Sequence, residues 1–250
     1  MTTLTVGHRG ARNLWPENSL AGFRKTLALG VRAIELDVHP SRDGRLMVIH
    51  DPTLERTTHA TGEVASHTAV QLAAIRLRDG DGEGVPTLDA VLDILAPSGA
   101  ELQLEIKTDV QGTRYPGVEV ALLEAVRRHR VEDRAILTCF VPEVLERVKS
   151  LWPAGRVLAS LDRRSAEMLG GLEAALARFA AIPGCLLAVE KSLLQHCLPQ
   201  CLARFGADRL GAWVPNEAAE IAEWQGKGLR QITTDRPDLA LVARDHIGKR

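Results

Sequence analysis

The five residues Ala33-Ile34-Glu35-Leu36-Asp37 decide how the rest of this chain is interpreted. A short, largely apolar run is typical of a buried strand, yet two acidic residues alternate within this one. Side chains at positions i and i+2 of a strand point to the same face, so Glu35 and Asp37 are expected to project together. The stretch therefore predicts a buried strand that carries charged side chains to its carboxyl end, where α/β barrels build their functional sites.

Similar short apolar or β-branched runs alternate with amphipathic segments along the chain, which is typical of repeated βα units around a parallel sheet. The expected strands cover residues 3–7, 33–37, 101–106, 135–138, 156–160, 186–189, 209–213 and 231–234. The expected helices cover residues 20–29, 88–95, 118–129, 143–151, 166–179, 193–205, 217–225 and 239–244. Eight strands that alternate with eight helices predict an α/β fold of the (β/α)8 TIM-barrel class.

Chain length and one irregular stretch define the expected domain organisation. A barrel fills 250 residues as a single unit, so residues 1–250 are predicted to form one TIM-barrel domain. Residues 39–87 interrupt the alternation with an extra strand at 46–50 and a polar, Gly-rich and Thr-rich remainder, which predicts a small insertion after the second strand. A doubly wound open sheet would give the same alternation, but residues 7–12, GHRGAR, lack its GxGxxG signature.

The charge balance and the N-terminus limit the expected location and partners. The 31 basic and 32 acidic residues nearly cancel, so nothing favours nucleic acid or stable membrane association, and the oligomeric state stays open. The first ten residues lack the features of a signal peptide, and we expect a cytoplasmic protein. Four scattered cysteines indicate reduced thiols, and the sequence His196-Cys197-x-x-x-Cys201 lacks the CxxC of a zinc knuckle.

A second charged pair lies at the end of the next long expected strand. Glu105 and Lys107 repeat the i, i+2 spacing of Glu35 and Asp37, so both pairs are expected at the mouth of the barrel. Three carboxylates at one end of a barrel repel one another unless they are protonated or bridged by a cation, and oxygen-only ligands suit Mg²⁺ or Ca²⁺ better than Zn²⁺. Although one Glu-x-Asp is more often a surface pair, the coincidence predicts that Glu35, Asp37 and Glu105 hold a divalent metal, Mg²⁺ or Ca²⁺.

Two histidines are expected near this acidic cluster. His8 follows the first strand and His50 ends the extra strand of the insertion. Imidazoles titrate near neutral pH, so the two side chains can share the roles of general acid and general base. Arg9 and Lys107 supply the positive charge that neutralises a transferring phosphoryl group. These residues predict metal-assisted chemistry on a phosphate.

Several motifs that carry these residues occur in a fixed order. They are His8-Arg9-Gly10, Pro16-Glu17-Asn18-Ser19, Glu35-x-Asp37-Val38, His50-Asp51, Glu105-x-Lys107, Trp213-Val214-x-Asn216 and Thr234-Asp235-Arg236-Pro237. In this order and spacing the chain resembles the glycerophosphodiester phosphodiesterase family, including its short bacterial cytoplasmic type. The resemblance spans nearly the whole chain and is weaker at about residues 109–205.

The resemblance implies a metal-dependent hydrolase that converts a small-molecule glycerophosphodiester to glycerol 3-phosphate and an alcohol such as choline or ethanolamine. It leaves open whether a cyclic phosphate forms on the way. The family's functional residues match the catalytic histidines His8 and His50, the metal carboxylates Glu35, Asp37 and Glu105, and the phosphate-binding cations Arg9 and Lys107.

Other motif residues have two interpretations. Trp213 either stacks on the substrate alcohol or packs inside the barrel. Asn18 and Ser19 fit the capping of a helix, and Asp235 fits the cap of the last helix. Glu190 and Lys191 form a charged pair that departs from the family pattern at the end of the pocket expected to contact the alcohol.

Two alternative functions would use the same scaffold. A lysophospholipase D-like hydrolase would need an apolar entrance for a lipid, which the polar insertion and the scarcity of aromatic residues, four Phe and one Tyr, do not favour. A non-catalytic barrel that binds phosphorylated ligands would usually lack a histidine or a metal ligand, and the sequence contains all of them.

Overall fold

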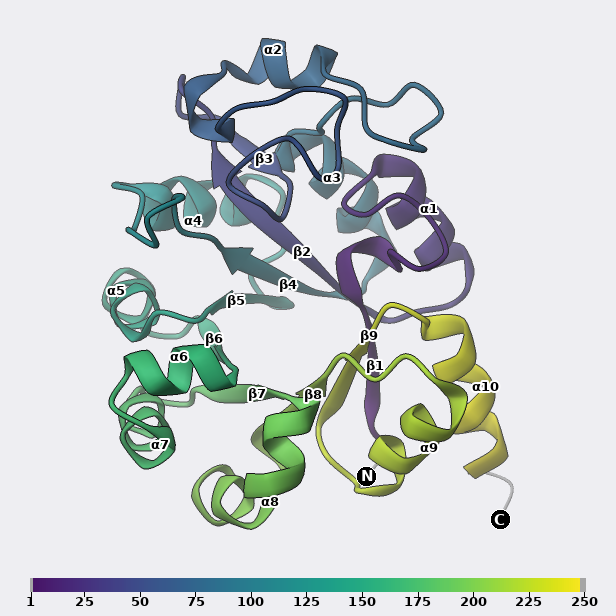
Figure 1. Ribbon diagram of the computed structural model, residues 1–250, viewed down its shortest axis with the longest axis vertical. Helices are drawn as coiled ribbons and strands as arrows, with labels where there is room; N and C mark the ends of the chain where they lie inside the picture. The colour runs from purple at the N-terminus through teal and green to yellow at the C-terminus, as the bar shows by residue number, and fades with distance from the viewer. Residues whose placement is uncertain (1, 248–250) are drawn as a thin grey trace. The chain divides into compact units, whose positions relative to one another are not determined.

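The computed structural model describes residues 2–247 and has the (β/α)8 TIM-barrel fold predicted from the sequence (Figure 1). Eight parallel strands alternate with helices along the chain, and a ninth, short strand belongs to the insertion. The described chain comprises two compact units, residues 7–135 and residues 2–6 with 136 onward, which are described in turn.

The unit of residues 7–135 contains the insertion and the strands that carry the acidic residues. Strand β2 (Ala33–Pro40) pairs in parallel with β4 (Glu101–Ile106) and antiparallel with β3 (Leu46–Val48). Its helices are α1 (Leu20–Ala28), α2 (Ala69–Ala74), α3 (Leu88–Leu95) and α4 (Val118–Arg128), with short 3-10 turns at His8–Gly10, Val64–Ser66 and Ala96–Ser98.

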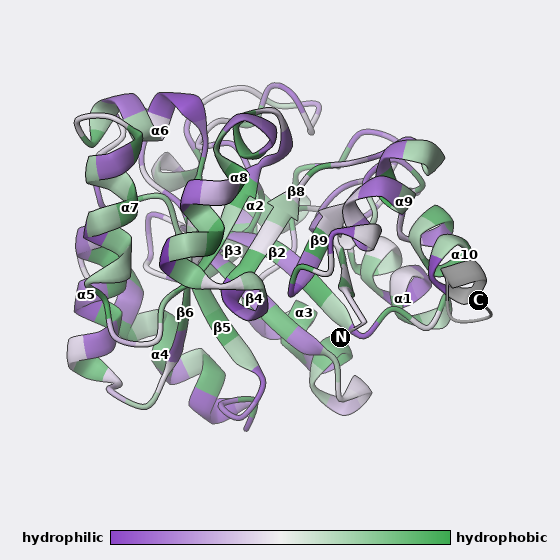
Figure 2. Ribbon diagram, turned by 90° about the horizontal axis from the view of Figure 1, so that it is seen from below, coloured by the Kyte–Doolittle hydropathy of each residue, from purple (hydrophilic) through white to green (hydrophobic). Residues whose placement is uncertain are grey.

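The other unit is a run of parallel strands joined by helices. Its strands are ordered β1 (Leu4–Gly7), β9 (Gln231–Thr234), β8 (Leu210–Trp213), β7 (Leu186–Glu190), β6 (Arg156–Leu161) and β5 (Ala135–Cys139). Its helices are α5 (Pro142–Leu151), α6 (Arg163–Met168), α7 (Leu172–Ala180), α8 (Lys191–Phe205), α9 (Ala218–Gly226) and α10 (Pro237–Ile247), with a 3-10 turn at Ala207–Arg209. Figure 2 shows β5 and β6 as mainly hydrophobic, as expected for strands buried on both faces. Within residues 2–247, no helix combines the length and apolarity needed to cross a membrane.

Two helices differ from the sequence prediction for identifiable reasons. The single helix expected at 166–179 is two helices, because Gly170 and Gly171 adopt left-handed φ angles of 91° and 103° between α6 and α7. Helix α2 was missed because its six residues are too few to show a helical period. A capping box between Thr68 and Gln71 marks its start.

The insertion has a hydrophobic core of its own, and its Gly-rich loop is attached to the first helix. The core is formed by Met47, Ile49, Leu54, Val64, Ala69, Leu72, Leu77 and Val85. In the loop at 80–84, the carboxylate of Glu83 accepts a 3.1 Å hydrogen bond from the backbone N–H of Ala21 at the start of α1. The position of the insertion relative to α1 is therefore fixed by specific contacts.

Candidate active site

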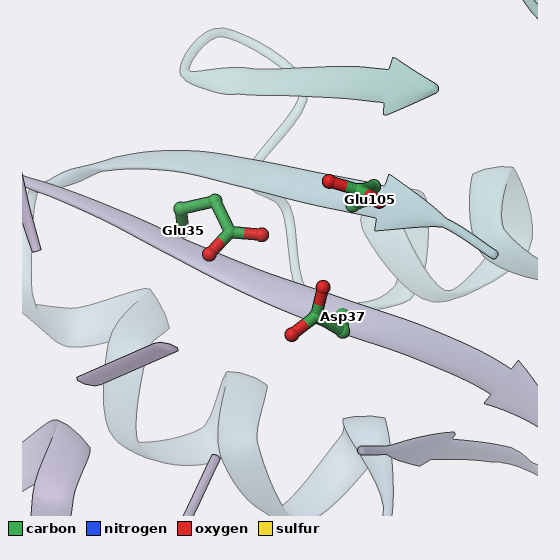
Figure 3. A group of neighbouring side chains, drawn as sticks. All are labelled: Glu35, Asp37 and Glu105. Atoms are coloured by element: carbon green, nitrogen blue, oxygen red, sulfur yellow. The ribbon is translucent and has the colours of Figure 1, made fainter. Parts of the chain in front are cut away.

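Strands β2 and β4 bring the three predicted metal ligands together (Figure 3). Asp37 on β2 lies opposite Glu105 on β4, and Glu35 lies two residues before Asp37 on the same strand. All three residues are buried, and each offers a carboxylate oxygen within 4.8 Å of those of the other two. The i, i+2 spacing and the register of two parallel strands therefore create one acidic cluster.

The electrostatics of this cluster suit a divalent cation. Burial raises the pKa of Glu35, and the negative charges of Asp37 and Glu105 raise it further. Burial would also raise the pKa of Asp37, but Lys107 and Arg9 hold it well below its usual range. Among the described residues, Oε1 of Glu35 accepts no hydrogen bond although it is buried. An oxygen-only cluster with an unsatisfied buried oxygen fits Mg²⁺ or Ca²⁺.

The two predicted phosphate-binding cations contact the same carboxylates. Lys107 Nζ lies 2.9 Å from Oδ1 of Asp37 and also contacts Glu105, and Arg9 Nε lies 3.2 Å from Oδ2 of Asp37. Burial lowers the pKa of each cation, but the surrounding carboxylates outweigh it, so both pKa values lie above their ordinary range. Both groups therefore stay charged, and their two positive charges partly compensate the three carboxylates.

A tight left-handed turn after β1 places His8 and Arg9 beside Glu35. Arg9, Gly10 and Ala11 have φ angles of 51°, 72° and 63°. A Cβ atom at Gly10 would approach the backbone nitrogen of Phe23 in α1 to 3.2 Å, so glycine allows α1 to pack closely. The backbone N–H of Arg9 donates to Oε2 of Glu35 at 3.2 Å, and His8 Nε2 lies 3.9 Å from the same oxygen.

His50 is held through both its side chain and its backbone. Its Nδ1 lies 2.6 Å from Oδ1 of Asp51. Its carbonyl lies 3.1 Å from Nε2 of His39, and Nδ1 of His39 lies 3.1 Å from the hydroxyl of Tyr115. Burial lowers the pKa of His39 to about 4, so this ring is neutral near pH 7. A carbonyl only accepts, so Nε2 of His39 donates to it, and the Tyr115 hydroxyl donates to Nδ1.

The sequence analysis assigned no role in the site to Glu17, Asn18 or Arg56. Asn18, expected only to cap a helix, donates from Nδ2 to Oδ2 of Asp37 at 2.9 Å, whereas Ser19 does cap α1 by accepting from Gly22 N–H. Glu17 and Arg56 form a bidentate ion pair beside Arg9. The two polar residues Glu17 and Asn18 inside the Pro16–Ser19 motif were the available signal, whereas Arg56 lies in a loop without periodicity.

Trp213 lies at the end of β8, in the unit of residues 136 onward. Its indole N–H donates to the carbonyl of Ala188 at 3.0 Å, and its ring meets Phe140 edge to face at 5.8 Å. Trp213 also packs against the buried residues Ile136 and Leu158. These contacts agree with the interpretation in which Trp213 packs inside the barrel, and they do not test whether it also contacts the substrate alcohol.

Glu190 and Lys191, which depart from the family pattern, make defined contacts in the same unit. The Glu190 carboxylate accepts from the backbone N–H groups of Ser192 and Leu193, at 3.1 and 3.0 Å, and so caps α8. Lys191 Nζ lies 2.5 Å from a carboxylate oxygen of Glu220 on α9. Both charges therefore have structural partners.

Comparison with known proteins gives one consistent family. A model of the "Glycerophosphoryl diester phosphodiesterase family" matches residues 8–239. A glycerophosphodiester phosphodiesterase from Caldanaerobacter subterraneus is 35% identical over 158 residues, which are 61% of this chain and 64% of that protein. The chain thus aligns with less than two thirds of the length of the curated relatives that it matches first.

Solved structures agree with the fold along the chain. One from Agrobacterium tumefaciens has a TM-score of 0.89 and 27% identity, with 100% of both chains covered. A phosphodiesterase from Oleispira antarctica, solved with the product sn-glycerol 3-phosphate, has a TM-score of 0.82 and 23% identity, with 98% of this chain and 97% of that chain covered. At 23% identity, the second likeness is a likeness of fold.

Replacing Glu35 by glutamine is expected to stabilise the metal-free protein. The raised pKa of Glu35 contributes stability below the ordinary glutamate value of 4.5, and this stability is lost as the pH rises through the raised value. The glutamine variant avoids that loss, so its advantage in free energy of unfolding should be absent at low pH and should grow as the pH rises to neutral. Chemical unfolding in excess chelator across this pH range measures it.

The matched control is Glu124→Gln on the exposed face of α4, which should change the free energy of unfolding by less than about 0.5 kcal/mol. Adding Mg²⁺ or Ca²⁺ should stabilise the parent protein more than Glu35→Gln. A parent protein that is as stable as the variant at neutral pH without metal would contradict the electrostatic interpretation.

Proposed function

Because the chain belongs to the glycerophosphoryl diester phosphodiesterase family, we propose that it hydrolyses glycerophosphodiesters to glycerol 3-phosphate and an alcohol. The observation that carries the proposal is the convergence of one acidic cluster, two cations and two histidines within residues 7–135. The family match over residues 8–239 supports the proposed substrate class. The cytoplasmic location expected from the sequence stays a prediction.

The acidic cluster is the proposed metal site. Glu35, Asp37 and Glu105 would hold Mg²⁺ or Ca²⁺ through oxygen atoms. When bound, such an ion polarises phosphoryl oxygens and stabilises developing negative charge. Asn18 and the backbone N–H of Arg9 orient two of the three carboxylates through hydrogen bonds, so these ligands keep their positions when the ion exchanges.

The two histidines are the proposed acid and base. The ring of His50 has its Nδ1 at Asp51, which accepts only, so Nδ1 carries the proton and Nε2 is the nitrogen available for proton transfer. His8 presents Nε2 on the side of Glu35. One histidine removes the proton of the attacking hydroxyl or water, and the other protonates the leaving alcohol oxygen. Arg9 and Lys107 bind the phosphate oxygens as fixed positive charges.

A substrate panel tests the activity and the metal together. Glycerophosphocholine, glycerophosphoethanolamine and lysophosphatidylcholine are each assayed after chelation and after re-addition of Mg²⁺, Ca²⁺ or Mn²⁺. We expect glycerol 3-phosphate from the first two substrates only when metal is present. Preferred cleavage of lysophosphatidylcholine would instead identify a lysophospholipase D-like enzyme. Tight binding of glycerophosphodiesters without release of alcohol at saturating metal would identify a binding protein.

His8→Ala and His50→Ala should each lower turnover by at least about 10², because a positioned acid or base contributes roughly 10² to 10⁴. His129→Ala is the matched control, since its side chain is 11% exposed against 12% for His8 and it pairs with Asp93. The control should retain near-normal turnover. Steady-state rates of the three variants, with circular dichroism to confirm folding, decide the matter, and near-normal rates in either His8→Ala or His50→Ala would sink the assignment.

We propose further that Trp213 contacts the leaving alcohol, from its place in the motif at the end of a barrel strand. An indole attracts a quaternary ammonium by about 1–2 kcal/mol, so Trp213→Ala should raise KM for glycerophosphocholine roughly 5- to 30-fold and raise KM for glycerol phosphodiesters of uncharged alcohols less. Equal changes in KM for both substrates would leave Trp213 a packing residue, held by Ala188 and Phe140.

A further inference from the structure

Arg56, in the insertion loop after β3, binds two carboxylates with one guanidinium group. Its Nη1 and Nη2 donate to the two oxygens of Glu17, each at 2.7 Å. Its Nε and Nη2 donate to the two oxygens of Asp51, at 2.5 and 3.2 Å. Both contacts are bidentate, and only the planar fork of an arginine makes two such contacts at once.

Each of these carboxylates in turn contacts a residue of the proposed reaction. Asp51 accepts from Nδ1 of His50 at 2.6 Å. Glu17 lies 3.4 Å from Nη1 of Arg9. Arg56 therefore joins, through one carboxylate on each side, the histidine of the insertion and the cation of the turn after β1. Glu17 and Arg56 are 39 residues apart in sequence.

The loop that carries Arg56 is fixed in place. Leu54 is fully buried in the core of the insertion, and its N–H donates to the carbonyl of Gly62 at 3.0 Å. The hydroxyl of the buried Thr58 donates to the carbonyl of Leu54 at 2.7 Å. The N–H of Arg78 donates to the carbonyl of Thr57 at 2.9 Å. The guanidinium thus extends from an anchored segment and not from a mobile one.

The burial of its two carboxylate partners also distinguishes Arg56 from a residue in an ordinary surface ion pair. The side chain of Arg56 is 44% exposed, whereas Glu17 is 10% and Asp51 24% exposed. Exposed ion pairs contribute little to stability and tolerate many geometries. Here four hydrogen bonds fix the orientation of the Arg56 guanidinium, and they thereby fix the Asp51 carboxylate that contacts His50.

We propose that Arg56 is a positioning residue for the reaction. It holds Asp51 so that His50 keeps its Nδ1–H tautomer and directs Nε2 into the active site. Through Glu17 it also fixes the position of Arg9 relative to His50. The proposal rests on the proposed function for its kinetic consequence, but its tautomer consequence is independent of any substrate. A carboxylate that is free to rotate away from Nδ1 would let the imidazole ring exchange tautomers and orientations.

The test compares Arg56→Ala and Arg56→Lys with Arg178→Ala in the full chain with Mg²⁺ added. Arg178 is the matched control, because its side chain is 43% exposed and it bridges the two carboxylates Glu143 and Glu146 on α5. Arg56→Lys keeps a cation beside Glu17 but not the double fork, so it decides the matter where Arg56→Ala fails to fold. Circular dichroism and thermal unfolding verify folding of each variant.

Two measurements are made on each variant. The first is the ¹⁵N NMR spectrum of the imidazole nitrogens at about pH 9, well above the ordinary imidazole pKa, with the His50 signals identified by their loss in His50→Ala. The second is kcat and KM with the glycerophosphodiester that the parent protein cleaves fastest. We expect a single Nδ1–H tautomer of His50 in the parent and in Arg178→Ala, and a mixture in the Arg56 variants.

For Arg56→Ala we expect kcat to fall about 10- to 100-fold, with KM changed less than about threefold, and for Arg56→Lys a smaller fall in the same direction. An unchanged tautomer in the folded Arg56 variants overturns the proposal, whatever the activity. A shifted tautomer in a protein that cleaves no glycerophosphodiester supports the positioning role and rejects the proposed function. A shifted tautomer with unchanged kcat rejects the kinetic role of Arg56.

Discussion

The site depends on the cost of placing three carboxylates within 4.8 Å of one another in a buried position. Uncompensated buried charge is costly, and a carboxyl group avoids that cost by taking up a proton or by gaining positive partners. Both responses occur here, because the pKa of Glu35 is raised while Lys107 and Arg9 keep Asp37 ionised. The acidic cluster therefore depends on the turn that carries Arg9 and on the strand end that carries Lys107, because these two cations compensate its charge.

The same balance of charges fits the proposed binding of a phosphate at this acidic site. Three carboxylates and two cations leave one net negative charge when all five groups are ionised, while Arg56 balances Glu17 and Asp51 faces His50. Two positive charges from a divalent ion would turn that excess into one net positive charge, which suits a singly charged phosphodiester. Arg9 and Lys107 would then be released in part from their carboxylate partners to contact phosphate. The proposed metal site and the proposed phosphate site would thus share one set of charges.

How far the sequence predicted this site follows from how each residue is positioned. Strand periodicity places Glu35 and Asp37 on one face, and the barrel fold predicted that Glu105 would lie near them, which the register of β2 and β4 bears out. The fold followed in the same way from alternating strands and helices, apart from the break at Gly170 and Gly171. Asn18 and Arg56 act from loops and through partners 19 and 39 residues away, which no local period encodes. His39 lies on β2 two residues after Asp37, but its contact with the backbone of His50 depends on the path of the insertion.

His50 lies on the insertion, so its position depends on how the insertion folds. Its neighbours Ile49 and Leu54 are buried in the hydrophobic core of the insertion, and the N–H of Ile49 donates to the carbonyl of Asp37 at 3.1 Å. The fold of the insertion therefore sets the position of His50 relative to the acidic cluster, while Asp51 and His39 set its orientation. A cluster on two barrel strands is rigid from its own hydrogen-bonded ladder, whereas a residue on a loop needs such additional support. The hydrogen bonds of Arg56 to Asp51 and Glu17 add to this support.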